Sequence, residues 1–374
     1  MVKLMSSFED TSPFEESFYI DLTGAAEASI LKSGGGRSEY LSEELISLLK
    51  TFQGKRVHYF VNPGNVGDYL IELGSLTLLR SFEIEIHITT SALDCAGEVV
   101  FFQGGGGFNE LYTVIEEILI QVTAANPKKI IVLPSTIFEL SPAILGLRHS
   151  DVLVTRDQQS FDILTKASLE ATVLISHDLG FFADLEGLIV DEATYNTINK
   201  RLALESKVAF PKLDEGIVGF LLREDLESAV EKVEGSVDIS SYYSWLEPQD
   251  CRLNRLVCFL TYIKQYQLVI TDRLHVAIAC HLMKIPCRLI ENSYGKNSAV
   301  ASFSLFDSDS VRFEKTFFQD EVYLTLLKLN QKSKVCDELT QQRDELTQQR
   351  DEILNSTIWR MTKPIRWFIG LLNN

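Results

Sequence analysis

The chain has 374 residues, of which 45% are apolar, and a formal net charge of −17. This length exceeds what one small core needs and suits two ordinary domains. The negative charge argues against non-specific binding of nucleic acid, because that binding needs a basic surface. The six cysteines form no CxxC pair, and the histidines do not cluster with them at ligand spacing, so the sequence predicts reduced thiols and no metal site.

The N-terminal segment is polar. Residues 1–37 are acidic and contain a run of three glycines near their end, so we expect a flexible acidic arm. The segment has no apolar signal region, and no apolar run of the chain approaches the ~20 residues of a membrane-spanning helix. These features predict a cytoplasmic protein. From Ser38, leucines at 41, 45, 48 and 49 lie on one helical face and predict an amphipathic helix that packs against the first domain.

Residues 38–184 repeat a pattern of strand, loop and helix. Apolar strands are predicted at 56–61, 84–89, 98–103, 129–133, 151–155 and 172–175, and helices at 69–82, 108–124 and 158–166. Strands that are apolar throughout indicate a parallel sheet with helices on both faces, as in a Rossmann-like domain. Ligands of such sheets bind at the carboxyl ends of the strands, so the residues after each strand are candidate site residues.

Two glycine-bearing loops of this domain are candidate ligand cradles. Residues 62–68 contain Gly64 and Gly67, and a glycine loop before a helix lets the backbone approach a phosphate or a sugar. The alternative is a tight turn in which Asp68 is the helix N-cap; the lysine of a P-loop and the third glycine of a dinucleotide fingerprint are missing. The glycine run at 104–107 costs backbone entropy that a plain turn does not require, which favours close approach of a ligand.

A second domain follows a stretch with a weaker pattern. Residues 185–213 predict a linker, and residues 214–330 predict a C-terminal Rossmann-like domain. Its first strand ends at Arg223. A later strand ends in a glycine-bearing loop with Lys296, which would bring a second cation to the pocket predicted next.

The strongest candidate site spans residues 269–280. A buried strand runs straight into an amphipathic helix, and either Thr271 or Asp272 is expected to be its N-cap. Arg273 and His275 then lie in or beside the first turn, where free N–H groups and the helix dipole disfavour cations. Two basic groups make sense there if an anion completes the site. The alternative is that Arg273 pairs with Asp272 and that His275 is a satisfied core histidine.

Residues 331–374 differ in composition from the rest of the chain. The sequence DELTQQR at 337–343 is repeated without change at 344–350, with one apolar residue per repeat. A stable coiled coil needs two apolar positions per heptad, so we expect an exposed helix that associates weakly. The tail at 356–372 interleaves basic and aromatic side chains. This mix suits the inner face of the cytoplasmic membrane, a groove on a partner or a contact between copies of the chain.

Taken together, these motifs resemble the polysaccharide pyruvyl transferase family. The resemblance rests on residues 64–68, 104–108, 133–136, 156–160, 177–181 and, above all, the Arg-Leu-His run at 273–278. It implies two Rossmann-like doubly wound domains in a GT-B-like arrangement. It also implies transfer of pyruvate from phosphoenolpyruvate onto two hydroxyl groups of a sugar or a lipid-linked saccharide, forming a cyclic ketal on a polysaccharide or its precursor. No cofactor is implied beyond the donor substrate.

The resemblance gives the predicted anion site a ligand, and with it hypothetical roles. Arg273 and Arg223 would clamp the phosphate and the carboxylate of the donor by bidentate contacts. His275 would either complete the clamp or protonate the methylene carbon as a general acid. Asp68 is the candidate base, with Asp178 behind it.

Other residues share the predicted site. The full set of predicted binding residues is Gly64, Asn65, Gly67, Gly105, Gly106, Ser135, Arg156, Asp178, Arg223, Arg273, Leu274, His275 and Lys296. Arg156 competes with Arg223 for the second position of the clamp. Two other functions stay open: a GT-B glycosyltransferase that holds a nucleotide diphosphate with Arg273 and Lys296, and a non-catalytic scaffold that works through residues 337–374.

Overall fold

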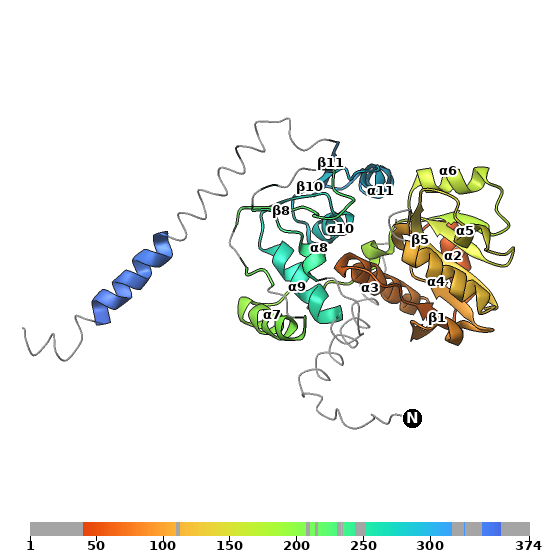
Figure 1. Cartoon of the computed structure of the whole chain (residues 1–374), viewed down its shortest axis with the longest axis horizontal. Helices are drawn as coiled ribbons and strands as arrows, with labels where there is room; N and C mark the ends of the chain where they lie inside the picture. The colour runs from red at the N-terminus through yellow and green to blue at the C-terminus, as the bar shows by residue number, and fades with distance from the viewer. Residues whose placement is uncertain are drawn as a thin grey trace, which may run out of the picture. The chain divides into compact units, whose positions relative to one another are not determined.

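The computed structural model describes residues 40–109, 113–206, 210–213, 216–229, 233, 235–243, 252–315, 325 and 339–352. The acidic arm predicted at 1–37 and the basic-aromatic tail at 356–372 lie outside these residues. Figure 1 shows two groups of strands, each with helices packed beside it. Both groups belong to one compact unit, and the helix at 339–352 belongs to a second unit.

The first sheet is parallel. Its strands are β1 (Arg56–Phe60), β2 (Glu85–Thr89), β3 (Val99–Phe102), β4 (Gly105–Phe108), β5 (Lys129–Ile137), β6 (Val152–Thr155) and β7 (Thr172–Ile175). They follow the order β2-β1-β3-β5-β6-β7, and β4 pairs with β5. The helices beside them are α2 (Glu43–Lys50), α3 (Val66–Ser81), α4 (Thr113–Ala124), α5 (Pro142–Leu145) and α6 (Gln158–Lys166). The predicted α/β class and parallel sheet are confirmed.

A second sheet has the order β11-β10-β9-β8. Its strands are β8 (Val218–Leu221), β9 (Leu268–Thr271), β10 (Cys287–Ile290) and β11 (Val311–Glu314), and β9, β10 and β11 pair in parallel. The helices of this half are α7 (Glu192–Ser206), α8 (Ile239–Tyr242), α9 (Arg252–Lys264), α10 (Leu274–Met283) and α11 (Lys296–Ser304). Helix α7 lies within the predicted linker at 185–213. The domain boundaries and the GT-B-like arrangement stay predictions.

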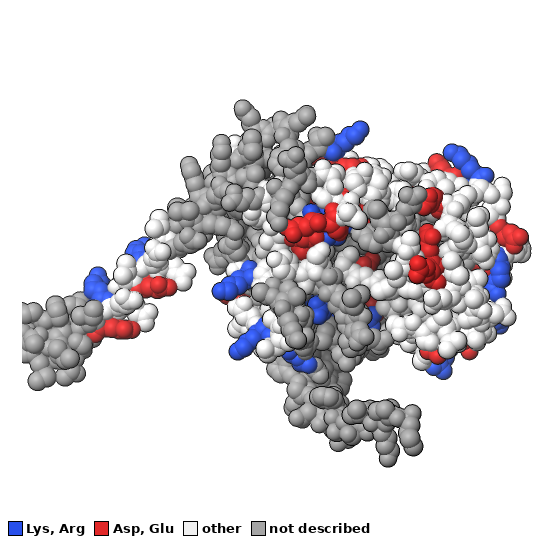
Figure 2. Space-filling model, viewed as in Figure 1, with Lys and Arg blue, Asp and Glu red and all other residues white. Residues whose placement is uncertain are grey.

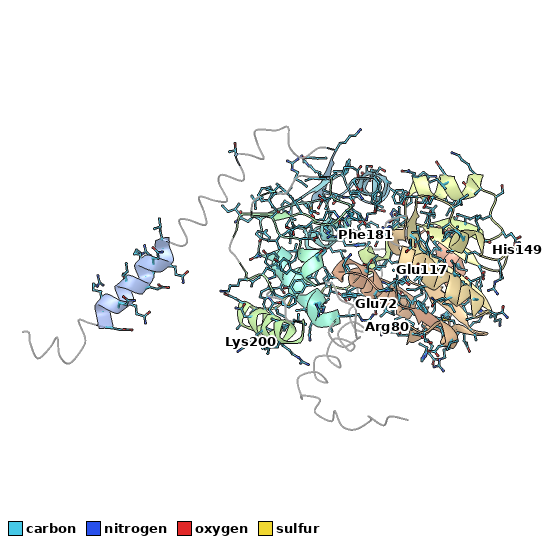
Figure 3. The ribbon with its side chains drawn as sticks, in the orientation of Figure 1. Glu72, Arg80, Glu117, His149, Phe181 and Lys200 are labelled. Carbon is cyan, nitrogen blue, oxygen red and sulfur yellow. The ribbon has the colours of Figure 1, made fainter. Side chains whose placement is uncertain are left out.

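One hydrophobic core includes side chains from both halves. It joins Leu70 of α3, Phe181 of the 3-10 helix η3 (Leu179–Phe182) and Ile278 of α10, all fully buried. Figure 3 labels Phe181, and Glu72 of α3, near the junction of the two halves. Helix α3 and η3 approach closely because Gly74 has no side chain: a Cβ there would lie 1.8 Å from the carbonyl oxygen of Leu179. Contacts of α3 with α9 and α10 fix the first-sheet loops against the second sheet.

Three helix starts differ from the sequence expectations. Helix α3 begins at Val66 with Asn65 as its N-cap, and the carboxylate of Asp68 accepts from the Asn65 N–H at 2.8 Å, so Asp68 closes a capping box instead of being the N-cap. Helix α10 has Arg273 at its N-cap position, so the assignment to Thr271 or Asp272 is wrong. Thr271 Oγ1 donates to Leu221 O at 2.6 Å, and Asp272 Oδ1 accepts from Arg223 N at 2.8 Å. Both side chains therefore bind β8 or its loop, and Thr271 Oγ1 also accepts from Arg273 N at 3.0 Å, at the start of α10.

Helix α4 is described from Thr113, and Phe108, where the sequence predicted its start, belongs to strand β4. The glycine run, which we expected to be a loop, forms strand β4 from Gly105 onward. Gly105 has φ +148°, in the region that favours glycine, so this strand needs that residue at its start.

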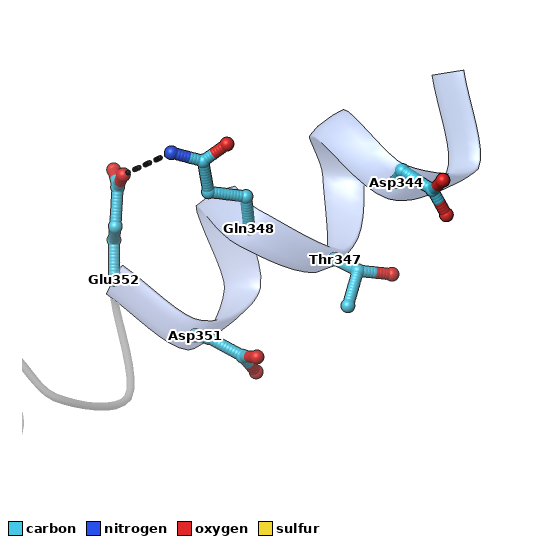
Figure 4. A pocket seen from close by; sticks show the side chains of 5 residues that line it. All are labelled: Asp344, Thr347, Gln348, Asp351 and Glu352. Atoms are coloured by element: carbon cyan, nitrogen blue, oxygen red, sulfur yellow. Dashed lines mark hydrogen bonds between the residues drawn. The ribbon is translucent and has the colours of Figure 1, made fainter. Parts of the chain in front are cut away.

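The described part of the heptad segment, 339–352, is helical. Its two leucines, Leu339 and Leu346, are exposed. Figure 4 shows one side of this helix, where Gln348 Nε2 donates to Glu352 Oε1 at 3.2 Å. The shallow groove there is lined by one helix alone. Among the helices that the structure describes, none is both long enough and apolar enough to cross a membrane.

Candidate active site

A cavity of about 650 Å³ lies at the carboxyl ends of strands from both sheets. The first sheet contributes the loops after β1, β3 and β6, and the second contributes the loop after β8 and the starts of α10 and α11. The predicted residues that line it are Gly64, Asn65, Asp68, Gly105, Gly106, Arg156, Arg223, Arg273, Leu274, His275 and Lys296. The structure thus brings most of the predicted site residues into one pocket.

Three predicted binding residues do not line the cavity. Gly67 lies beneath His275, and a Cβ there would be 2.5 Å from His275 Nδ1. Ser135 is buried within β5, where its hydroxyl donates to Leu133 O at 2.8 Å. Asp178 is fully buried behind His275. These residues support the pocket from behind.

The sequence interpretation missed several residues of the wall. They are Gln103, Val114, Ile115, Asp225, Glu227, Ser240 and Ser241. Asn62, Pro63, Gly104, Gly107 and Phe108 also line the cavity, and they belong to the loop and the glycine run that the sequence marked as cradles. Gln103 follows β3, and Asp225 follows Arg223 closely, so the rule that ligands bind at strand ends could have found both. Ser240 and Ser241 line the cavity from the short helix α8. They do not directly follow a strand, so the strand-end rule could not find them.

Arg223 is surrounded by carboxylates. Its Nε and Nη2 donate to the two oxygens of Asp225, at 2.7 and 3.0 Å, and its Nη1 donates to Glu227 Oε2 at 2.5 Å. Burial alone would lower the pKa of this guanidinium, but Asp225, Glu227 and Asp272 raise it above its ordinary value. Arg223 is therefore a permanently charged group held in a fixed orientation.

Arg273 is held in the same way by a different carboxylate. Its Nε donates to Asp238 Oδ1 at 3.0 Å, its Nη2 bonds the second oxygen of Asp238, and Nη2 also lies 2.9 Å from Asp225 Oδ2. The predicted alternative pairing with Asp272 is therefore wrong, because that carboxylate binds the Arg223 N–H instead. Among the described residues, Arg273 Nη1 has no hydrogen-bond acceptor.

Lys296 is the third cation of the second sheet. Its Nζ donates to Glu227 Oε2 at 2.6 Å and lies over the Tyr294 ring. Burial, with Arg223 and Arg156 nearby, lowers the pKa of Lys296 to about 8 despite the Glu227 contact. Burial would raise the pKa of Glu227, but Lys296 and Arg223 lower it to about 2.

The first sheet supplies a fourth cation and the carboxylate behind His275. Arg156 is fully buried; its Nε donates to Thr136 Oγ1 at 2.8 Å and its Nη1 to Asp178 Oδ2 at 2.5 Å. The same Asp178 oxygen lies 3.5 Å from His275 Nε2. Burial would raise the pKa of Asp178, but Arg156 and His275 hold it well below its ordinary value. Asp178 is therefore a permanent anion that faces the imidazole.

Asp68 also lines the cavity, and the side chain of Gln103 holds its backbone. Gln103 Nε2 donates to Asp68 O at 2.8 Å, and Gln103 Oε1 accepts from Asn62 N at 3.0 Å. Asp68 Oδ2 is held by the capping box, whereas no donor among the described residues bonds Oδ1, which lies near Gly105. One carboxylate oxygen is thus fixed and the other is available to the pocket.

No group of three or more His, Cys, Asp and Glu side chains within the described residues has the geometry of a metal site. The pocket is instead a set of alternating cations and carboxylates. Figure 2 shows that acidic and basic side chains are also interspersed over the visible face of the described residues.

These features define a doubly wound α/β protein with a polar pocket at the carboxyl ends of its strands. The model of one such family, polysaccharide pyruvyl transferase, matches residues 65–294, which is more than half of the chain. The chain therefore belongs to the polysaccharide pyruvyl transferase family, as its motifs predicted. Membership makes it a transferase with a role in pyruvyl transfer during polysaccharide synthesis.

Two further proteins are similar to this chain. General stress protein 30 of Bacillus subtilis (strain 168) is 25% identical over 279 residues, which cover 65% of this chain and 76% of that protein. The crystal structure of a functionally uncharacterized protein from Klebsiella pneumoniae subsp. pneumoniae NTUH-K2044 matches with a TM-score of 0.57 at 24% identity, over 73% of this chain and 98% of the other. The second likeness concerns the fold alone.

Proposed function

We propose that this chain transfers pyruvate from phosphoenolpyruvate onto two hydroxyl groups of a sugar, as a cyclic ketal, in a polysaccharide or its precursor. The observation that carries this proposal is that Arg223, Arg273 and His275 meet in one pocket of a chain that belongs to this family. A guanidinium group is suited to bidentate contact with phosphate and carboxylate, which are the two anionic groups of this donor. The acceptor is either a free sugar or a lipid-linked saccharide.

His275 acts first, as a general acid. Its proton goes to the methylene carbon of the donor, which leaves a cationic centre at the carbon that carries the phosphate. Asp178 stabilises the protonated imidazole from behind, in the manner of a carboxylate that faces a catalytic histidine.

The two hydroxyl groups of the acceptor then add in turn. The first hydroxyl oxygen bonds to the cationic carbon and gives up its proton to Asp68, whose Oδ1 faces the pocket. The bond from this carbon to the phosphate oxygen breaks and inorganic phosphate leaves. The second hydroxyl oxygen bonds to the same carbon and its proton goes to the released phosphate, which closes the ketal. The proton that Asp68 took up returns to His275 through solvent. The donor and the two hydroxyl groups supply every atom of the ketal and of the released phosphate, so this chemistry needs no cofactor beyond the donor.

Calorimetry with phosphoenolpyruvate tests the proposal. We expect wild type to bind it with micromolar to millimolar affinity, Arg273→Ala to lose this binding, and Arg312→Ala, which removes an exposed arginine of β11, to retain it. Wild type should then release inorganic phosphate when an acceptor sugar is present, and His275→Ala should not.

Other outcomes point elsewhere. Release of a free nucleotide from a nucleotide sugar would identify a glycosyltransferase instead. A folded wild type that binds neither donor would refute the enzymatic assignment and favour the scaffold. Contacts through the tail, with a membrane or with another copy, stay predictions because the tail lies outside the described residues.

A further inference from the structure

The space between Arg223 and Arg273 holds a carboxylate of the protein itself. Asp225 Oδ2 lies 3.0 Å from Arg223 Nη2 and 2.9 Å from Arg273 Nη2, so one oxygen bridges the two guanidinium groups. An anion that bridged these arginines would place an oxygen at the same position. A donor held by both of them must therefore replace Asp225.

Asp225 differs from the other carboxylates of the network in exposure. Its side chain is 30% exposed and lines the cavity, whereas the side chains of Glu227 and Asp238 are 3% and 4% exposed. Asp238 fixes Arg273, and Glu227 fixes both Arg223 and Lys296, through side chains that are almost fully buried. Asp225 lies on the ligand side, in the short loop after β8, and can leave without opening the core.

A second cationic position adjoins the first. Arg156 and Lys296 lie close to Gly106 and line the cavity with it: a Cβ at residue 106 would lie 2.8 Å from Arg156 Nη2 and 3.4 Å from Lys296 Nζ. No described residue accepts a hydrogen bond from Arg156 Nη2. Lys296 and Arg223 share Glu227 Oε2 as an acceptor, so the two positions are neighbours.

We propose that Asp225 is a resident anion that selects for ligands with two anionic groups, an inference that rests on the proposed donor. One group of the ligand exchanges with Asp225 between Arg223 and Arg273, and the second enters the space beside Gly106. A ligand with a single anionic group, such as inorganic phosphate, replaces one anion by another and gains little. A ligand with two groups makes the exchange and adds the contacts with Arg156 and Lys296.

Calorimetry on Asp225→Asn tests the selection, with inorganic phosphate and phosphoenolpyruvate as probes. Asparagine keeps the shape and removes the charge, so the affinities of phosphate and of phosphoenolpyruvate should both rise at least tenfold, and phosphate should bind measurably only in the variant. Asp307→Asn removes one exposed carboxylate elsewhere and should change neither value by more than twofold. Weaker binding of both probes by Asp225→Asn, or unchanged phosphate binding, would overturn the inference, because a carboxylate that only positions arginines would give these results.

Hydrogen exchange on the wild type gives a second measurement. The Glu227 N–H donates to Asp225 Oδ1 at 3.1 Å, and this bond breaks if Asp225 leaves. Saturating phosphoenolpyruvate should therefore speed exchange in residues 224–229, and slower exchange there on binding would contradict displacement. If wild type does not bind phosphoenolpyruvate but Asp225→Asn binds phosphate, the proposed donor is wrong and the role of Asp225 stands.

Discussion

The substitution Gly67→Ala should move the His275 side chain while leaving its imidazole group intact, so it tests the position of His275 alone. A Cβ at residue 67 would lie 2.5 Å from His275 Nδ1 and 2.8 Å from His275 Cβ. Ordinary contact begins near 3.4 Å, so the imidazole has to move by about 0.9 Å. A rotation of the side chain cannot relieve the contact with Cβ, so the start of α10 must shift. Gly67 is not among the glycines with positive φ, so alanine is compatible with its backbone.

The magnitude follows from two opposing terms. Overpacking costs typically 1–3 kcal/mol, while replacing a helical glycine by alanine gains roughly 0.5–1 kcal/mol. We therefore expect a folded protein that loses about 1 kcal/mol of unfolding free energy, within the range of these terms. A displacement of about 1 Å of a reacting group reduces rate by on the order of 100-fold. Activity should fall far more than stability.

Two assays check this expectation. Urea denaturation measures the unfolding free energy, and phosphate release from phosphoenolpyruvate with an acceptor sugar measures kcat/KM. The control is the same substitution in a His275→Gly background, where the contacting side chain is absent and the stability loss should disappear. Full activity in Gly67→Ala, or the same stability loss in both backgrounds, would refute the role of Gly67 as the support of His275.

Two further predictions concern charge. Glu72→Ala should lower the unfolding free energy by about 3 kcal/mol in urea denaturation, because Arg252 Nη1 loses a buried carboxylate at 2.6 Å. The double variant Glu72→Met with Arg252→Met should lose less unfolding free energy than Glu72→Ala. A loss below about 1 kcal/mol in Glu72→Ala would contradict this prediction. Donor affinity should fall as pH rises through about 8, because Lys296 holds an anion only when protonated and its pKa is lowered to about 8 by burial. Calorimetry at several pH values around 8 measures the donor affinity. In Lys296→Arg the affinity should no longer change near pH 8. If the change persists in that variant, another group causes it.

The strands were predictable because their pattern is local. The apolar run of β6 is buried along its whole length and is bounded by Asp151 and Arg156. The strand-end rule then located Arg156, Arg223 and Lys296 without knowledge of the tertiary structure. This rule therefore placed the three cations at the cavity, and their roles in binding a donor stay predictions.

The helix caps at the site were not predictable in the same way. Thr271 has the side chain of a good N-cap and precedes α10, yet its hydroxyl donates to Leu221 O on the neighbouring strand. Asp272 accepts from Arg223 N, a residue far away in sequence. Thr271 Oγ1 still accepts from Arg273 N at the start of α10, but a buried hydroxyl or carboxylate also takes the partners that the fold supplies, and the sequence does not show these.

The carboxylates that pair with the cations were also not predictable from the sequence, and they change how the site is interpreted. Basic residues near the start of α10 suggested an anion from solution, but Asp238 and Asp225 already supply carboxylates to Arg273. Asp238 comes from the N-cap of α8, and nothing in its spacing from residue 273 indicates that the two meet. An external anion can therefore bind at the two donors that have no acceptor among the described residues, Arg156 Nη2 and Arg273 Nη1. It can also bind at the bridging position if Asp225 leaves it.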